Sequence, residues 1–213
     1  MQNIEELKKR TIYQNFEDIS WIAKNSRSKE KLDAINFNPK WLTILDVWCN
    51  TWYFPIRFSQ AWAKHVTWID VDKKWWAWEN VIEIANWYKE FYKINNIDFK
   101  INSIFDEEIK WKFDAVTCFS TFHYFRERQE EFFNIVNELL NEWGLLIWEW
   151  WLSQDHELEK YSRWVDEEPC YFPSLERIKE MAKWFEVIYY WKSVDQKWDK
   201  IPRFVIHFKK VWK

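Results

Sequence analysis

LTILDVWCNTW, residues 42–52, is the stretch of sequence that decides the fold. Its first half, residues 42–47, is a short and continuous apolar run of the kind found in a strand that is buried on both faces. The polar residues that follow lead into the helical apolar spacing of residues 53–61. A strand, a tight loop and a helix are therefore predicted. In open α/β sheets the ligand lies beside such a loop, at the carboxyl end of the strand.

The same alternation continues outward from this stretch. Strand-like runs and helical patterns follow one another over residues 65–71, 76–92, 97–101, 113–119, 127–140 and 145–148. After a helical pattern at 174–183, residues 185–190 and 203–208 read as two strands that can pair as an antiparallel hairpin at one edge. The pattern predicts an α/β fold with a mostly parallel, seven-stranded sheet and helices on both faces.

The N-terminal part has its own pattern. Residues 3 to about 35 carry helix-like apolar spacing, which ends at the break Asn36-Phe37-Asn38-Pro39. The rest of the chain contains no internal repeat and no shift in composition that would mark a second domain. We therefore expect residues 1–38 to be a helical lead-in and residues 39–213 to be one domain.

Composition excludes several classes of protein. The 213 residues carry 31 Lys+Arg and 34 Asp+Glu, for a net charge of -3, so there is no general electrostatic attraction to nucleic acid. No run approaches the roughly 20 apolar residues of a membrane span, and residues 1–10 lack the apolar core of a secretory signal. The three cysteines are widely spaced, which suggests neither a disulfide framework nor a zinc site. We expect a cytoplasmic protein that binds no metal.

Glycine and tryptophan are present in unusual numbers, with one Gly and 20 Trp. Average usage would give roughly 7% glycine, or about 15 residues. Several tryptophans stand where turns favour glycine, among them Trp111, Trp143 and Trp198. We interpret most of the tryptophans as replaced glycines and a few, such as Trp148, as original. The alternative is a natural protein rich in tryptophan.

Under this interpretation the loop after the first strand carries a recognisable motif. With glycine in place of two tryptophans, residues 46–52 read D-V-G-C-N-T-G, which resembles the first motif of class I S-adenosylmethionine-dependent methyltransferases. The resemblance implies that this backbone passes close to the methionine part of the cofactor and that the acid binds the ammonium group, directly or through water. The cofactor-binding residues that it implies are Asp46, Trp48, Cys49, Asn50 and Trp52. The residues alone leave open an ordinary loop with an N-capping Asn or Thr.

The second strand-like run also ends in an acid, Asp70, 24 residues after Asp46. An acid about 20 residues beyond a glycine-rich loop, at the next strand end, is placed to accept both hydroxyls of a ribose. The resemblance gives Asp70 this role. After the third strand the family often has an acid that faces the adenine, but this chain has Asn102-Ser103 there. Adenine recognition is thus left to Ser103 or to backbone groups.

The segment after the fourth run, DAVTCFSTFHY at residues 114–124, resembles the family's fourth motif, which forms one wall of the cofactor and substrate pocket. The resemblance implies that Phe119 contacts the cofactor. It also makes His123 either a general base for the acceptor or a polar group of the wall. Cys118 is expected to be a buried strand thiol, because no basic neighbour in sequence would lower its pKa.

These motifs cover roughly residues 40–150 and imply the transfer of a methyl group from S-adenosylmethionine to a small molecule, a protein or RNA. The run 41–70, with Ala61-Trp62-Ala63-Lys64, and the later residues Cys170–Leu175 also resemble the wobble-uridine tRNA-modifying branch, which makes tRNA one candidate partner. A left-handed conformation costs a tryptophan roughly 1–2 kcal/mol, and about 15 such sites would exceed a typical stability of roughly 5–15 kcal/mol. We therefore expect the chain to fold poorly and, with tryptophan in the cofactor loop, to bind no cofactor. Two alternatives are a nicotinamide-dependent oxidoreductase, whose loop would resemble G-x-G-x-x-G, and a non-catalytic Rossmann-like binding or scaffold protein.

Overall fold

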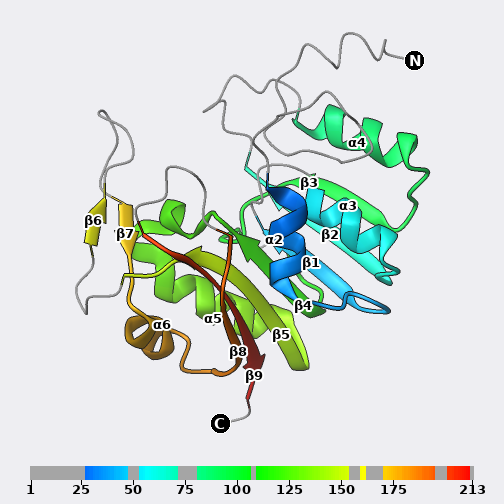
Figure 1. Cartoon of the computed structure of the whole chain (residues 1–213). Helices are drawn as coiled ribbons and strands as arrows, with labels where there is room; N and C mark the ends of the chain where they lie inside the picture. Colours follow the sequence, from blue (N-terminus) through cyan, green and yellow to red (C-terminus); the bar gives the residue numbers. More distant parts are fainter. Residues whose placement is uncertain are drawn as a thin grey trace.

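The computed structural model describes residues 27–47, 53–71, 81–106, 109–153, 159–161, 170–194 and 201–211. Their main feature is a seven-stranded sheet with the order β3-β2-β1-β4-β5-β9-β8 (Figure 1). The parallel strands are β1 (Thr43–Val47), β2 (His65–Asp70), β3 (Ile97–Ile101), β4 (Phe113–Phe119) and β5 (Leu140–Trp151). Beside β5, β9 (Arg203–Lys210) and β8 (Phe185–Lys192) form an antiparallel pair. The predicted α/β fold, with a mostly parallel sheet and a C-terminal hairpin, is confirmed.

Helices cover both faces of this sheet. One face packs against α2 (Ser28–Ile35), α3 (Tyr53–Gln60) and α4 (Val81–Phe91). The other packs against the 3-10 helix η1 (Phe122–Arg128), α5 (Gln129–Leu139) and α6 (Leu175–Met181). A separate ribbon of β6 (Glu159–Tyr161) and β7 (Cys170–Phe172) was not predicted, because three-residue strands are too short to show a period. None of the helices in these segments is long and apolar enough to cross a membrane.

The central strands are continuous apolar runs because both of their faces are buried. In β1, Leu45 and Val47 belong to the core beneath α5, whereas Ile44 belongs to the core beneath α3. Successive side chains of a strand point to opposite faces. Asp46 therefore lies on the same face as Ile44, the face that α2, α3 and α4 cover.

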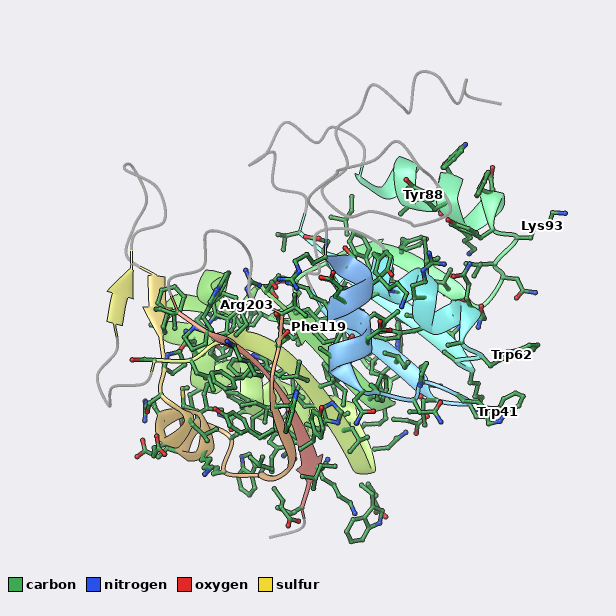
Figure 2. The ribbon with its side chains drawn as sticks, in the orientation of Figure 1. Trp41, Trp62, Tyr88, Lys93, Phe119 and Arg203 are labelled. Atoms are coloured by element: carbon green, nitrogen blue, oxygen red, sulfur yellow. The ribbon has the colours of Figure 1, made fainter. Side chains whose placement is uncertain are left out.

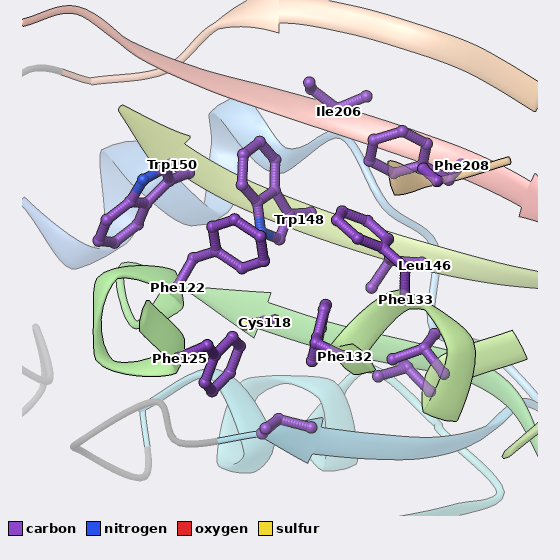
Figure 3. Close-up of a cluster of buried hydrophobic side chains, with 14 of the residues drawn as sticks. Cys118, Phe122, Phe125, Phe132, Phe133, Leu146, Trp148, Trp150, Ile206 and Phe208 are labelled. Carbon is purple, nitrogen blue, oxygen red and sulfur yellow. The ribbon is translucent and has the colours of Figure 1, made fainter. Parts of the chain in front are cut away.

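Aromatic side chains dominate the core beneath α5 (Figure 3). The ring of Phe122 in η1 lies edge-on to Trp148 in β5, with 5.1 Å between centroids. Phe133 in α5 meets Phe208 in β9 in the same way at 5.9 Å. Such pairs contribute roughly 0.5–1.5 kcal/mol beyond the area that they bury. The core therefore holds η1, which directly follows β4, firmly against β5.

β5 begins earlier than its apolar run, which predicted a strand over residues 145–148 only. Its pairing with β4 shifts between Phe113 and Ala115, where the strand accommodates extra residues. Trp143 has a φ of 63° at this irregularity. A Cβ on Gly144 would lie 2.9 Å from the Leu140 Cβ, so only glycine fits there without a shift of that side chain. Because these residues are polar and interrupt the regular pairing, the hydrophobic pattern did not predict the first half of the strand.

α2 is the described part of the predicted N-terminal helix, and residues 1–26 lie outside the described residues. The helix ends at Asn36, whose φ of 48° lies in the left-handed region, at the break that the sequence predicted. The division into a lead-in and a domain at residue 38 stays a prediction.

Candidate functional site

The carboxyl ends of the parallel strands meet at one edge of the sheet. The strand order reverses at the centre of this edge, because β1 has its successor β2 on one side and β4 on the other. Ligands of open α/β sheets bind at such a switch point. The residues that follow β1 and β4 are therefore the first candidates for a functional site.

Asp46 lies next to the carboxyl end of β1 and its side chain is completely buried. Its register partners are Trp68 on β2 and Thr117 on β4. The Thr117 hydroxyl donates a hydrogen bond to the Asp46 carboxylate. Because a buried carboxylate requires hydrogen-bonding partners, Thr117 helps to fix this acid at the switch point.

Asp70 and Ser103 lie close together, at the ends of β2 and β3. Asp70 is the last residue of β2 and is only half-buried, and its carboxylate accepts a hydrogen bond from the Val71 N–H at 2.7 Å. A hydrogen bond joins the end of β3 to the end of β2, since the Asn102 N–H donates to the Asp70 carbonyl oxygen at 2.8 Å. The Ser103 N–H donates to the Asp106 carboxylate at 2.9 Å, so sequence analysis missed an acid that lies in this turn.

Phe119 ends β4 with its side chain in the core. Its ring centroid lies 4.7 Å from that of Phe54 and 6.4 Å from that of Phe58, both on α3. Phe119 is 3% exposed. The ring thus joins β4 to α3, and its predicted contact with the cofactor stays a prediction. Phe119 is labelled near the centre of the view in Figure 2.

Four of the predicted cofactor residues, Trp48, Cys49, Asn50 and Trp52, lie outside the described residues. The backbone of His123 belongs to η1, directly after β4, whereas its side chain is outside the described part. Cys118 is a fully buried strand thiol, as predicted. Burial raises its pKa far above the ordinary value, and its Sγ lies 3.2 Å from the Thr121 hydroxyl.

Beyond β4 the edge carries a group of charged and hydroxyl side chains that the sequence analysis missed. We call it the Glu149 cluster, and its members are Lys31, Ser120, Glu149, Ser193 and Arg203. The Glu149 carboxylate is 2% exposed and lies 3.5 Å from the Lys31 Nζ and 3.6 Å from an Arg203 guanidinium nitrogen. The hydroxyls of Ser120 and Ser193 donate to it at 2.7 and 3.2 Å.

The electrostatics of this cluster favour an ionised Glu149. Burial by itself would raise its pKa, but the charges of Lys31 and Arg203 and the hydrogen bonds from the two serines hold the pKa below its ordinary value. Arg203 is 1% exposed, and its guanidinium lies 3.6 Å from the centroid of the Trp151 ring. Buried charges with this many partners are retained only where the geometry is specific.

Ser120 is the centre of the cluster. Its hydroxyl accepts hydrogen bonds from the Lys31 Nζ at 3.1 Å and from Arg203 at 2.6 Å, while it donates to Glu149. Its φ of 58° is left-handed, and its N–H donates to the Glu149 carbonyl oxygen at 3.0 Å. One signal in the sequence was available: residues 145–151, LLIWEWW, place a charge inside an otherwise apolar run.

Among the described residues no group of three or more His, Cys, Asp or Glu side chains could hold a metal ion. Two of the four histidines can be described. His65 is partly exposed and lies 3.2 Å from the Asp98 carboxylate, and His207 is buried on β9 with its Nε2 2.7 Å from the Ile35 carbonyl oxygen. Neither histidine lies at the carboxyl ends of the strands.

No protein-family profile and no curated protein sequence matches the chain. Solved structures do match its fold. TehB from Haemophilus influenzae is similar over 91% of this chain with a TM-score of 0.66 and 18% identity, and this chain spans 64% of TehB. N-methyltransferase NodS from Bradyrhizobium japonicum WM9, in complex with S-adenosyl-L-homocysteine, is similar over 87% of this chain and 86% of its own, with a TM-score of 0.64 and 13% identity.

Magnesium protoporphyrin IX methyltransferase (ChlM) from Synechocystis PCC 6803, with bound SAM, is similar over 86% of this chain and 79% of its own, with a TM-score of 0.64 and 13% identity. These three similarities cover 86–91% of this chain. At such identities they establish the fold and leave the reaction to be proposed. The chain has the fold of the class I S-adenosylmethionine-dependent methyltransferases.

Proposed function

We propose that this chain is an S-adenosylmethionine-dependent methyltransferase. The observation that carries the proposal is the position of Asp46, a completely buried carboxylate at the switch point of this fold. Burial of a carboxylate costs several kcal/mol unless it is well paired. An acid in this position suits the ammonium group of an amino-acid moiety, which forms charge-assisted hydrogen bonds with it.

The acids on neighbouring strand ends suit the two ends of the cofactor. Asp46 would bind the ammonium group, and Asp70, at the end of the adjacent strand, would accept the ribose hydroxyls. Ser103, which is tied to the end of β3, would contact the adenine, and the loop at 48–52 would border the methionine part. The presence of S-adenosyl-L-homocysteine in the NodS structure and of SAM in the ChlM structure supports this choice of cofactor.

The bound cofactor supplies an electrophilic methyl group. The chain's own task is then to hold the acceptor in line with that group, to exclude water and, where the acceptor requires it, to remove a proton. His123 follows β4 on η1, so it is the proposed base or polar wall group.

A small molecule is the acceptor class best supported by the comparisons. ChlM and 1,6-didemethyltoxoflavin-N1-methyltransferase from Burkholderia thailandensis are named for small-molecule acceptors. A screen for methyltransferase activity should test small molecules first and should also include proteins and RNA, with tRNA among the RNA acceptors. A cytoplasmic location stays a prediction.

We further propose that Trp48 and Trp52 occupy glycine positions and impair cofactor binding. The decisive experiment is calorimetric titration of S-adenosyl-L-homocysteine into the chain and into a Trp48→Gly/Trp52→Gly variant. We expect binding at micromolar concentrations by the glycine variant and none by the chain as written. In the glycine variant, Asp70→Asn should weaken binding roughly 10- to 100-fold, because hydrogen bonds to a charged group are lost.

Asp98→Asn is the matched control, since Asp98 is an exposed acid on the neighbouring strand β3. It should leave binding unchanged. A glycine variant that is folded and does not bind S-adenosyl-L-homocysteine would overturn the proposal. That result would favour a non-catalytic protein with the same fold.

A further inference from the structure

α2 is too short to be stable on its own. It has eight residues, and the side chain of its N-cap residue, Arg27, makes no capping hydrogen bond. Isolated helices shorter than about 12–15 residues are marginal in water, so most of the stability of such a helix comes from packing. The contacts between α2 and the sheet therefore decide whether this helix forms.

Those contacts come from one side of the helix. The Lys31 Nζ reaches Ser120 at 3.1 Å and Glu149 at 3.5 Å, at the ends of β4 and β5. One turn later, the Ile35 carbonyl oxygen lies 2.7 Å from the His207 Nε2 on β9. Residues four apart lie on the same helix face. The two contacts thus hold α2 across β4, β5 and β9.

This position covers a particular part of the functional edge. Asp46 and Asp70 occupy the ends of β1 and β2, whereas the Glu149 cluster occupies the ends of β4 and β5 and the start of β9. The cofactor of the proposed function takes the first half, which leaves the second half for the acceptor. α2 is fastened to this acceptor half.

We propose that Glu149 is a positioning residue that, through Lys31 and Ser120, locks α2 and the turn after β4 together at the acceptor half of the edge. The assignment of that half to the acceptor rests on the proposed function. The lock itself is independent of it. Ser120 joins the two parts, because the same hydroxyl accepts from Lys31 and donates to Glu149 immediately before the helix that carries His123.

Glu149 acts here without contact to the reacting atoms. Its carboxylate holds three parts of the chain at once: Lys31 on α2, Ser120 after β4 and Ser193 after β8. Arg203 balances its charge, so loss of Lys31 leaves Glu149 with one cationic partner and does not leave it isolated. Removal of Lys31 should therefore free α2 without unfolding the sheet.

The test is hydrogen exchange of the α2 amides, measured by mass spectrometry on the full chain. Lys31→Met should speed exchange over residues 31–36 by roughly 10- to 100-fold, the effect of losing hydrogen bonds to a charged group. Peptides from β4, β5 and β9 should be unchanged. Lys31→Arg keeps the charge and should restore most of the protection, which a role in packing alone would not predict.

Lys29→Met is the matched control, because Lys29 pairs with Asp33 at 2.7 Å on the exposed side of the same helix. Its exchange should equal that of the unchanged chain. If the α2 amides of the Lys31→Met variant exchange as slowly as those of the unchanged chain, Lys31 does not hold α2 in place, and the proposed lock is overturned whatever ligand the protein binds. If the folded Trp48→Gly/Trp52→Gly variant does not bind S-adenosyl-L-homocysteine while the Lys31-dependent exchange persists, only the assignment of this half to an acceptor is overturned.

Discussion

Three tryptophans occupy a backbone conformation that normally requires glycine. Trp41, Trp62 and Trp143 have φ values of 67°, 67° and 63°. Their rings are 66%, 69% and 60% exposed, so burial compensates little for the strained backbone. Figure 2 shows Trp41 and Trp62 together at one margin of the molecule, where the Trp41 N–H donates to the Trp62 carbonyl oxygen at 2.9 Å. We predict that glycine relieves the backbone strain at each position, with a net gain in stability only where no cation–π contact is lost.

The magnitude follows from three opposing effects. Removing the Cβ from a left-handed residue removes a steric clash and raises the free energy of unfolding by roughly 1–2 kcal/mol per site. Glycine has greater conformational freedom in the unfolded chain, which lowers the free energy of unfolding by roughly 0.5–1 kcal/mol. Lys40 lies 5.6 Å from the Trp41 ring centroid and Lys209 lies 4.9 Å from that of Trp143, and loss of such an exposed cation–π contact costs about 0.5–1 kcal/mol. The net gain is about 0.5–1 kcal/mol at Trp62, and close to zero at Trp41 and at Trp143.

Urea denaturation followed by circular dichroism measures this gain. With a slope of roughly 1–3 kcal/mol per molar urea, the double variant Trp41→Gly/Trp62→Gly should raise the midpoint by about 0.25–0.5 M. Trp41→Ala/Trp62→Ala should gain little, because alanine also carries a Cβ in the left-handed region. These alanine variants separate the backbone effect from the removal of two exposed rings.

Trp191→Gly is the second control. Trp191 is 64% exposed but lies in β8, with an extended backbone, so glycine there should destabilise by roughly 0.5–1 kcal/mol. The backbone explanation is refuted if alanine stabilises as much as glycine at positions 41 and 62. It is equally refuted if Trp191→Gly stabilises to the same extent.

Two further predictions concern the buried polar groups. Burial lowers the pKa of His207 below its ordinary value of 6.5 despite its bond to Ile35, and Lys31 and Arg203 help to hold the pKa of Glu149 below 4.5 despite burial. Both shifts mean that the unfolded chain binds more protons, so the free energy of unfolding should fall on acidification below about pH 7, first through His207 and below pH 4.5 through Glu149. Urea titrations at several pH values measure this, with His207→Gln expected to flatten only the upper step. The Trp148 Nε1 is buried without a hydrogen-bond partner among the described residues. Because an unsatisfied donor costs about 1–3 kcal/mol and lost ring volume costs a comparable amount, Trp148→Phe should change the midpoint far less than Trp148→Ala.

The parts of the fold that could be predicted are those in which one stretch of chain carries its own signal. Strands buried on both faces are continuous apolar runs, as in β1 and β4, and the acids Asp46 and Asp70 end such runs. The first half of β5 could not be predicted, because its irregularity near Gly144 breaks the run. Trp68 illustrates a different limit, because its side chain is fully buried and packs edge-on against Phe99. Its environment depends on β3, which begins 29 residues later.

The two halves of the functional edge differ in the same way, and the difference has a physical origin. On the cofactor half, each predicted acid is placed by its own strand, so a motif of a few residues is enough to find it. On the acceptor half, Lys31 is 118 residues from Glu149, and Arg203 is 54 residues beyond it. No local pattern relates these residues, and only the fold brings their charges together. The acceptor half can therefore change through distant substitutions while the strand-end acids stay in place, which is why the fold and the cofactor are easier to infer from this chain than the acceptor.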